Sequence, residues 1–138
     1  MIIIDANNLI LGRLASFAAR KVLLGEEVQI VNCEKAIISG DKKYTLQKYK
    51  LKFDKGIPLK GPYFPRTPDR IVRRTVRGML PFKRARGREA YKRVMCYTGM
   101  PEGLKQKPIT IKEADASKHP NTRFITVEKI SKHLGVKL

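Results

Sequence analysis

The chain has 138 residues, of which 42% are hydrophobic, and this length and composition suit one domain with a buried core. Thirty lysines and arginines face twelve acidic residues, and the formal net charge of +18 indicates a nucleic acid or an anionic membrane surface as partner. No apolar run approaches the roughly 20 residues of a membrane span. The start MIIID has no basic region of a signal peptide. We therefore expect a cytoplasmic protein.

The first part of the chain has the pattern of a βαβ unit. Residues 1–4 and 28–33 are short apolar runs typical of buried strands, and residues 11–24 carry apolar side chains at helical spacing before Gly25. A strand, a helix and a strand in this order predict parallel pairing. The intervening turn lacks the glycine pattern of a dinucleotide site, and no P-loop motif is present, so a nucleotide site is disfavoured.

A short apolar stretch, a lysine-rich helix and a loop are predicted next. Residues 36–39 are apolar, and Asp41 can cap a helix that runs to about residue 53. Its lysines form a second basic surface, which either contacts phosphate or is only solvated. Residues 56–68 are rich in proline and glycine and predict a loop. Tyr63 and Phe64 within it can stack on bases, but we favour the interpretation that they anchor the loop to the core.

Nine of the twelve arginines lie between Pro65 and Arg93, a stretch that we call the arginine segment. A helix is predicted from Pro68 to the stop at Pro81, with Thr67 as its N-cap. At helical spacing the apolar side chains gather on one side (Ile71, Val72, Thr75, Val76, Met79, Leu80) and four arginines on the other (Arg70, Arg73, Arg74, Arg77). Because arginine binds phosphate through a planar fork of donors, this face predicts nucleic-acid binding.

The remaining elements are short. A loop at residues 82–87 carries Lys83, Arg84 and Arg86, and a second short helix is predicted from about Gly87 to about Arg93. Residues 94–98 predict a strand, residues 113–118 a helical turn and residues 123–125 an extended segment. Thr126 is the predicted cap of a last helix over residues 127–134. No boundary between domains is evident, so we expect a single domain over residues 1–138.

Three other functions are disfavoured by the sequence. Cys33, Cys96 and the two histidines show no close ligand spacing, so we expect no bound metal and no cofactor. Asp5, Glu34 and Asp41 could meet at the edge of the sheet and hold magnesium, as in a nuclease, but no signature connects them. A DNA-binding protein is also possible from the arginine helix, but no helix-turn-helix spacing or dimerisation stripe supports it.

Several motifs resemble one known family, the universal large-subunit ribosomal protein thirteen in its archaeal and eukaryotic branch. Asp5-Ala6 followed by Leu11-Gly12-Arg13-Leu14-Ala15-Ser16 matches its N-terminal motif. The run from Val31 to Ala36 with Ser39-Gly40 resembles its second-strand motif. The most specific match is the string GPYFPRTPDRIVRRTVRGMLPFKRARGREAYKRV at residues 61–94. The short chain is similar to the archaeal type, which lacks the tail of eukaryotic members.

The resemblance implies a fold, a function and a set of contacts. It implies a three-layer α/β/α fold with a small, mainly parallel sheet, and a structural protein rather than an enzyme. It also implies binding to large-subunit ribosomal RNA, a role in assembly, and neighbouring ribosomal proteins as partners. With the arginine segment, the candidate RNA-binding residues are Arg13, Lys60, Arg66, Arg70, Arg73, Arg74, Arg77, Lys83, Arg84, Arg86, Arg88 and Arg93. We expect Arg73→Glu with Arg77→Glu to weaken RNA binding and to leave the fold intact.

Overall fold

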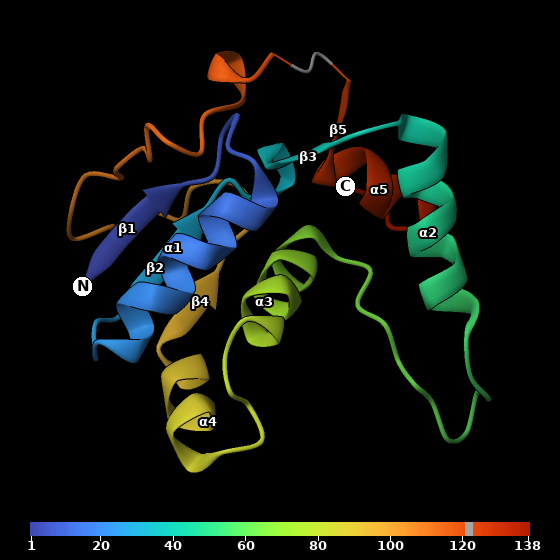
Figure 1. Ribbon diagram of the computed structural model, residues 1–138, viewed down its shortest axis with the longest axis horizontal. Helices are drawn as coiled ribbons and strands as arrows, with labels where there is room; N and C mark the ends of the chain where they lie inside the picture. The colour runs from blue at the N-terminus through green and yellow to red at the C-terminus, as the bar shows by residue number, and fades with distance from the viewer. Residues whose placement is uncertain (121–122) are drawn as a thin grey trace.

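The computed structural model describes residues 1–120 and 123–138, and their fold is mixed α/β (Figure 1). The helices are α1 (Leu11–Leu23), α2 (Lys42–Asp54), α3 (Pro68–Gly78), α4 (Ala85–Lys92) and α5 (Val127–His133). The strands are β1 (Ile2–Asp5), β2 (Val28–Val31), β3 (Ile37–Ser39), β4 (Val94–Cys96) and β5 (Phe124–Thr126). The predicted α/β fold with a small, mainly parallel sheet and a basic helical segment is confirmed.

The main sheet has the strand order β1-β2-β4, and all of its pairs are parallel. In register, Ile4 pairs with Ile30 and Ile30 pairs with Cys96. Both connections advance in the same direction across the sheet, so right-handed crossovers place α1 and α3 on the same face. There the two helices pack against each other, with the buried side of α3 (Ile71, Val72, Val76) in the common core (Figure 1).

A second, antiparallel pair of strands lies beside this core. β3 pairs with β5. Helices α2 and α5 both contact β5, and they also contact each other. The predicted caps are confirmed for both helices, because Asp41 Oδ2 accepts from the Tyr44 amide at 3.2 Å and Thr126 Oγ1 accepts from the Lys129 amide at 3.4 Å. Thr45 is the one fully buried residue of α2, and the lysines of this helix are exposed and form the second basic surface.

The ends of α3 differ in detail from the prediction. Thr67 occupies the N-cap position, but its hydroxyl caps no amide of the helix and has no partner among the described residues. The helix ends at Gly78, earlier than predicted, and Met79 follows as its C-cap. Met79 is 43% exposed and does not join the core as predicted, whereas Leu80 is buried as predicted.

The two cysteines are buried free thiols. A hydrogen bond with Cys96 and burial raise the pKa of the Cys33 thiol, so the reactive thiolate is suppressed. Among the described residues, no helix combines the length and the apolar composition needed to cross a bilayer. Within these described residues, no three histidine, cysteine, aspartate or glutamate side chains lie close enough together to hold a metal ion.

Candidate nucleic-acid interface

The outer face of α3 carries the arginines that the helical spacing predicts. Arg70 and Arg74 are exposed one turn apart, and no hydrogen bond, ion pair or ring contact within the described residues ties either of them down. Arg73 and Arg77 are half-buried on the flank of the same helix. The four guanidiniums therefore share one side of the helix, but two are free and two are held.

Arg73 and Arg77 are held by an aromatic pair. The guanidinium carbon of Arg73 lies 4.5 Å from the ring centre of Tyr91, and that of Arg77 lies 4.0 Å from the ring centre of Phe82. The two rings meet edge to face at 5.4 Å. Arg73 Nε also donates to the carbonyl of Val94 at 3.0 Å. These contacts fix α3 against α4 and β4, and they orient two guanidiniums before any ligand arrives.

The start of α3 is anchored from a distant element. The buried hydroxyl of Ser131, on α5, donates to the carbonyl of Arg66 at 2.6 Å. The guanidinium carbon of Arg66 lies 5.2 Å from the ring centre of Phe53, at the end of α2. α5 and α2 thereby position the first arginine of the segment.

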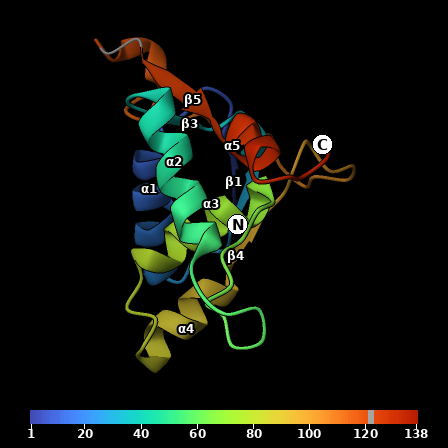
Figure 2. The ribbon, with the colours of Figure 1, turned by 90° about the vertical axis from the view of Figure 1, so that its right-hand side faces the viewer.

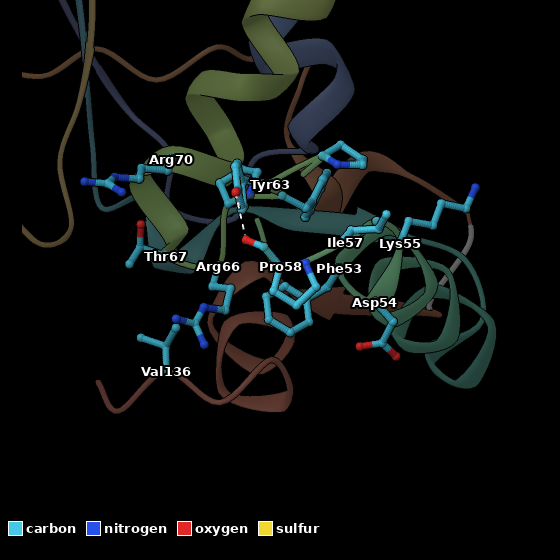
Figure 3. A pocket seen from close by; sticks show the side chains of 14 residues that line it. Phe53, Asp54, Lys55, Ile57, Pro58, Tyr63, Arg66, Thr67, Arg70 and Val136 are labelled. Atoms are coloured by element: carbon cyan, nitrogen blue, oxygen red, sulfur yellow. Dashed lines mark hydrogen bonds between the residues drawn. The ribbon is translucent and has the colours of Figure 1, made fainter. Parts of the chain in front are cut away.

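Three neighbouring hollows in the protein surface lie along α3. The first, of about 620 Å³, contains Arg66 and Arg70 in its wall (Figure 3). The second, of about 500 Å³, includes Arg70, Arg73 and Arg74. The third, of about 550 Å³, includes Arg74 and Arg77. Arg70 and Arg74 each border two hollows, so the three form one row, which we call the α3 groove. Its basic residues are Lys55, Arg66, Arg70, Arg73, Arg74, Arg77, Lys83 and Arg84.

The charge of the α3 groove is almost entirely positive. Asp54, at the rim of the first hollow, is the only carboxylate among the described residues that line it (Figure 3). The ion pairs Lys21–Glu26 and Lys132–Glu128 both lie outside the arginine segment. Such a concave row of cations with a single carboxylate at its rim concentrates positive potential and favours a polyanion.

The other predicted contact residues lie outside the groove. Lys60 is exposed in the loop before α3, and Arg86 is exposed on α4. Arg88 is exposed on α4 and donates to the carbonyl of Lys83 at 3.4 Å. Arg93 is half-buried and donates to the carbonyl of Val22, at the end of α1, at 3.4 Å. The structure therefore does not gather all of the candidates into one surface.

Arg13 lies apart from the arginine segment and holds a loop. Its guanidinium donates to the carbonyl of Glu113 at 2.8 Å and lies 2.9 Å from Nε2 of His119. These bonds connect α1 to the segment that leads to the short turn Ala116–Lys118. Arg13 is exposed, so an RNA contact stays a prediction, but its guanidinium already has partners within the chain.

The three carboxylates of the magnesium alternative each have a structural role. Asp5 Oδ1 accepts from the amide of Asn7 at 3.0 Å and from the Asn32 side chain at 2.9 Å. Glu34 Oε2 accepts from the amide of Gly99 at 2.9 Å, and Asp41 caps α2. Each carboxylate accepts a hydrogen bond from within the protein, and the three do not form a shared metal site in the described part of the chain.

The two adjacent aromatic residues of the loop before α3 differ in their exposure to solvent. Phe64 packs edge to face on Tyr49 at 5.9 Å, which agrees with the anchoring role that we favoured. Tyr63 instead is 66% exposed at the border of two hollows. The sequence did not separate the two, because adjacent residues in an irregular loop have no periodicity that assigns them to a face.

The contacts of Arg73 change the expected outcome of its substitution. We expect Arg73→Glu alone to lower the free energy of unfolding by about 1–3 kcal/mol, because it removes a hydrogen bond to Val94 and a cation–π contact with Tyr91. Urea denaturation checks this. Arg73→Lys keeps the charge and is the control, and an unchanged unfolding midpoint for Arg73→Glu would contradict the structural role. We therefore no longer expect Arg73→Glu with Arg77→Glu to leave stability unchanged. Substitutions at Arg70 and Arg74, which lack such contacts, are better suited to test binding alone.

Comparisons with known proteins point to one family. The family model described as ribosomal protein L13 matches residues 1–103, which include the whole arginine segment. The large ribosomal subunit protein uL13 of Methanosarcina barkeri is 50% identical over 139 residues, covering 99% of each chain. The proteins of the same description from Archaeoglobus fulgidus and Methanocaldococcus jannaschii are each 47% identical, and they cover 96% and 99% of this chain and 86% and 99% of their own length.

Proposed function

Because this chain belongs to the ribosomal protein L13 family, a family of structural proteins of the large ribosomal subunit and not of enzymes, we propose that it binds large-subunit ribosomal RNA through the α3 groove. In this proposal the protein stabilises the folded RNA during assembly and in the translating ribosome, in the cytoplasm. Other large-subunit proteins are its neighbours there.

The observation that carries the proposal is the continuity of the α3 groove. Eight basic side chains line three adjoining hollows, with Asp54 as the one carboxylate among the described lining residues. Folded RNA is recognised largely through phosphates, 2′-hydroxyls and shape, and arginine binds phosphate oxygens in pairs. A concave basic row on a rigid helix suits a phosphate backbone that runs along it.

The mechanism that follows is positional. Arg70 lies between the first and second hollows, and Arg74 lies between the second and third hollows. Two phosphate groups from different RNA strands can therefore be held one helix turn apart, one by each arginine. Each bound guanidinium screens the repulsion between the strands that it bridges. Because Arg73 and Arg77 are already oriented by Tyr91 and Phe82, little side-chain freedom is lost on binding.

Salt dependence of the affinity for RNA is the experiment that tests this proposal. We expect the affinity for deproteinised large-subunit ribosomal RNA to fall by about 10³-fold or more between 50 and 200 mM salt, as for six or more phosphate contacts. Filter binding at a series of salt concentrations measures the slope. An affinity that is flat over this range would contradict a phosphate-based interface.

A further inference from the structure

We propose that the exposed ring of Tyr63 is a stacking platform for one unpaired RNA base, which lies in a hollow beside Arg70. This inference rests on the proposed function and deepens it, because it assigns a base contact to a surface otherwise described only through phosphates. The loop that carries Tyr63 projects from the body between α2 and α3 (Figures 1 and 2).

The ring of Tyr63 is exposed but held in place. Its hydroxyl donates to the carbonyl of Pro58 at 2.8 Å (Figure 3). Ile57 and Gly61 exchange backbone hydrogen bonds of 2.8 and 3.2 Å, which close the turn beneath it. A Cβ atom placed at Gly61 would lie 3.2 Å from the nearest ring carbons of Tyr63, so the ring packs closely against the turn. A rigid, exposed aromatic ring loses little conformational entropy when a flat ligand stacks on it.

Tyr63 and Arg70 form part of the wall that separates two hollows. Both residues, with Phe64 and Pro65, line the first hollow and the second hollow of the α3 groove. The two volumes, about 620 and about 500 Å³, fall within the roughly 300–1,000 Å³ of small-ligand sites. A base in either hollow therefore lies beside the tyrosine ring, and its phosphate lies within the field of Arg70.

The surroundings favour a nucleotide over a protein side chain as the occupant. Arg66, Arg70, Arg73 and Arg74 line the two hollows, and Asp54 is the only carboxylate among the described lining residues. Stacking on an aromatic ring combined with cations that follow the backbone is the general way in which proteins hold unpaired nucleotides. Phe64 supplies the contrast, because its ring packs on Tyr49 and anchors the loop.

The test compares substitutions at Tyr63 with a matched tyrosine. Tyr44 on α2 is 65% exposed among lysines and lines none of the three hollows, so Tyr44→Leu is the control. Tyr63→Phe removes the hydrogen bond to Pro58 and keeps the ring, whereas Tyr63→Leu removes both. The full chain is bound to deproteinised large-subunit ribosomal RNA, and affinity is measured together with ultraviolet crosslinking of residue 63 to nucleotides by mass spectrometry.

We expect wild type and Tyr63→Phe to crosslink at residue 63 to the same base and to bind within about threefold of each other. Tyr63→Leu should lose this crosslink and bind about 5- to 150-fold more weakly, and Tyr44→Leu should leave the crosslink at residue 63 unchanged. Wild-type affinity in Tyr63→Leu, or a crosslink of residue 63 to a protein in intact subunits, would overturn the inference. If Arg70→Glu with Arg74→Glu weakens binding and Tyr63→Leu does not, the inference fails and the proposed function stands.

Discussion

Arg70→Glu combined with Arg74→Glu is expected to weaken binding to large-subunit ribosomal RNA by at least about 30-fold at 0.15 M salt. Two lost phosphate contacts account for that factor through counterion release alone, and the new carboxylates add repulsion. The slope of log affinity against log salt should become shallower by about 2. Both side chains are exposed without partners among the described residues, so the free energy of unfolding should change little.

A control with the same change in charge separates this local effect from net charge. Lys105→Glu with Lys107→Glu also replaces two cations by two anions, and both lysines are exposed in the loop after β4. We expect this variant to keep most of the affinity and most of the salt slope. Equal weakening in the two double variants would mean that overall charge, and not the α3 groove, determines binding.

Gly87→Ala is expected to have the largest effect on stability. Gly87 is buried in α4, and a Cβ atom there would overlap the carbonyl carbon and oxygen of Pro81. These are backbone atoms, so either the loop 81–84 or α4 must move. We expect a loss of about 1–3 kcal/mol or more in the free energy of unfolding, measured by urea denaturation. The shift would also displace Lys83 and Arg84 from the third hollow.

Gly78→Ala is the matched control for this substitution. Gly78 is the last residue of α3, it is exposed, and a Cβ atom there would meet no atom within 4 Å. An alanine in a helix is favoured over glycine by up to about 1 kcal/mol, so Gly78→Ala should leave the unfolding midpoint unchanged or raise it. An equally stable Gly87→Ala variant would contradict the close approach of α4 to Pro81.

The helices and strands were largely predictable because their signals are local. The spacing of Ile71, Val72 and Val76 predicted the buried side of α3, and the same spacing predicted its arginine face. Asp41 and Thr126 were correctly predicted as N-caps, because a short polar residue directly before a helical pattern is typical of an N-cap. Thr67 has the same local signal, yet its hydroxyl is buried and makes no cap bond, so this signal alone does not determine whether a cap forms.

The arrangement of the α3 groove could not be predicted in the same way. Tyr91 and Phe82 hold Arg73 and Arg77, and the buried Ser131 holds the backbone of Arg66. Each of these contacts joins residues from different elements, and no spacing within one element encodes them. Arginines that look equivalent on a helical projection are therefore divided by their tertiary partners into held and free groups, which decides the variants that test binding.

Arginine accessibility in the intact large ribosomal subunit tests the central claim most directly. The free protein and the purified subunit are treated with an arginine-specific glyoxal reagent, and modification is read residue by residue by mass spectrometry. We predict that Arg70 and Arg74 react readily in the free protein, where they are exposed, that they are protected in the subunit, and that they become reactive again when high salt releases the protein. Full reactivity of both arginines within the intact subunit would contradict the assignment of the α3 groove as the RNA-binding surface.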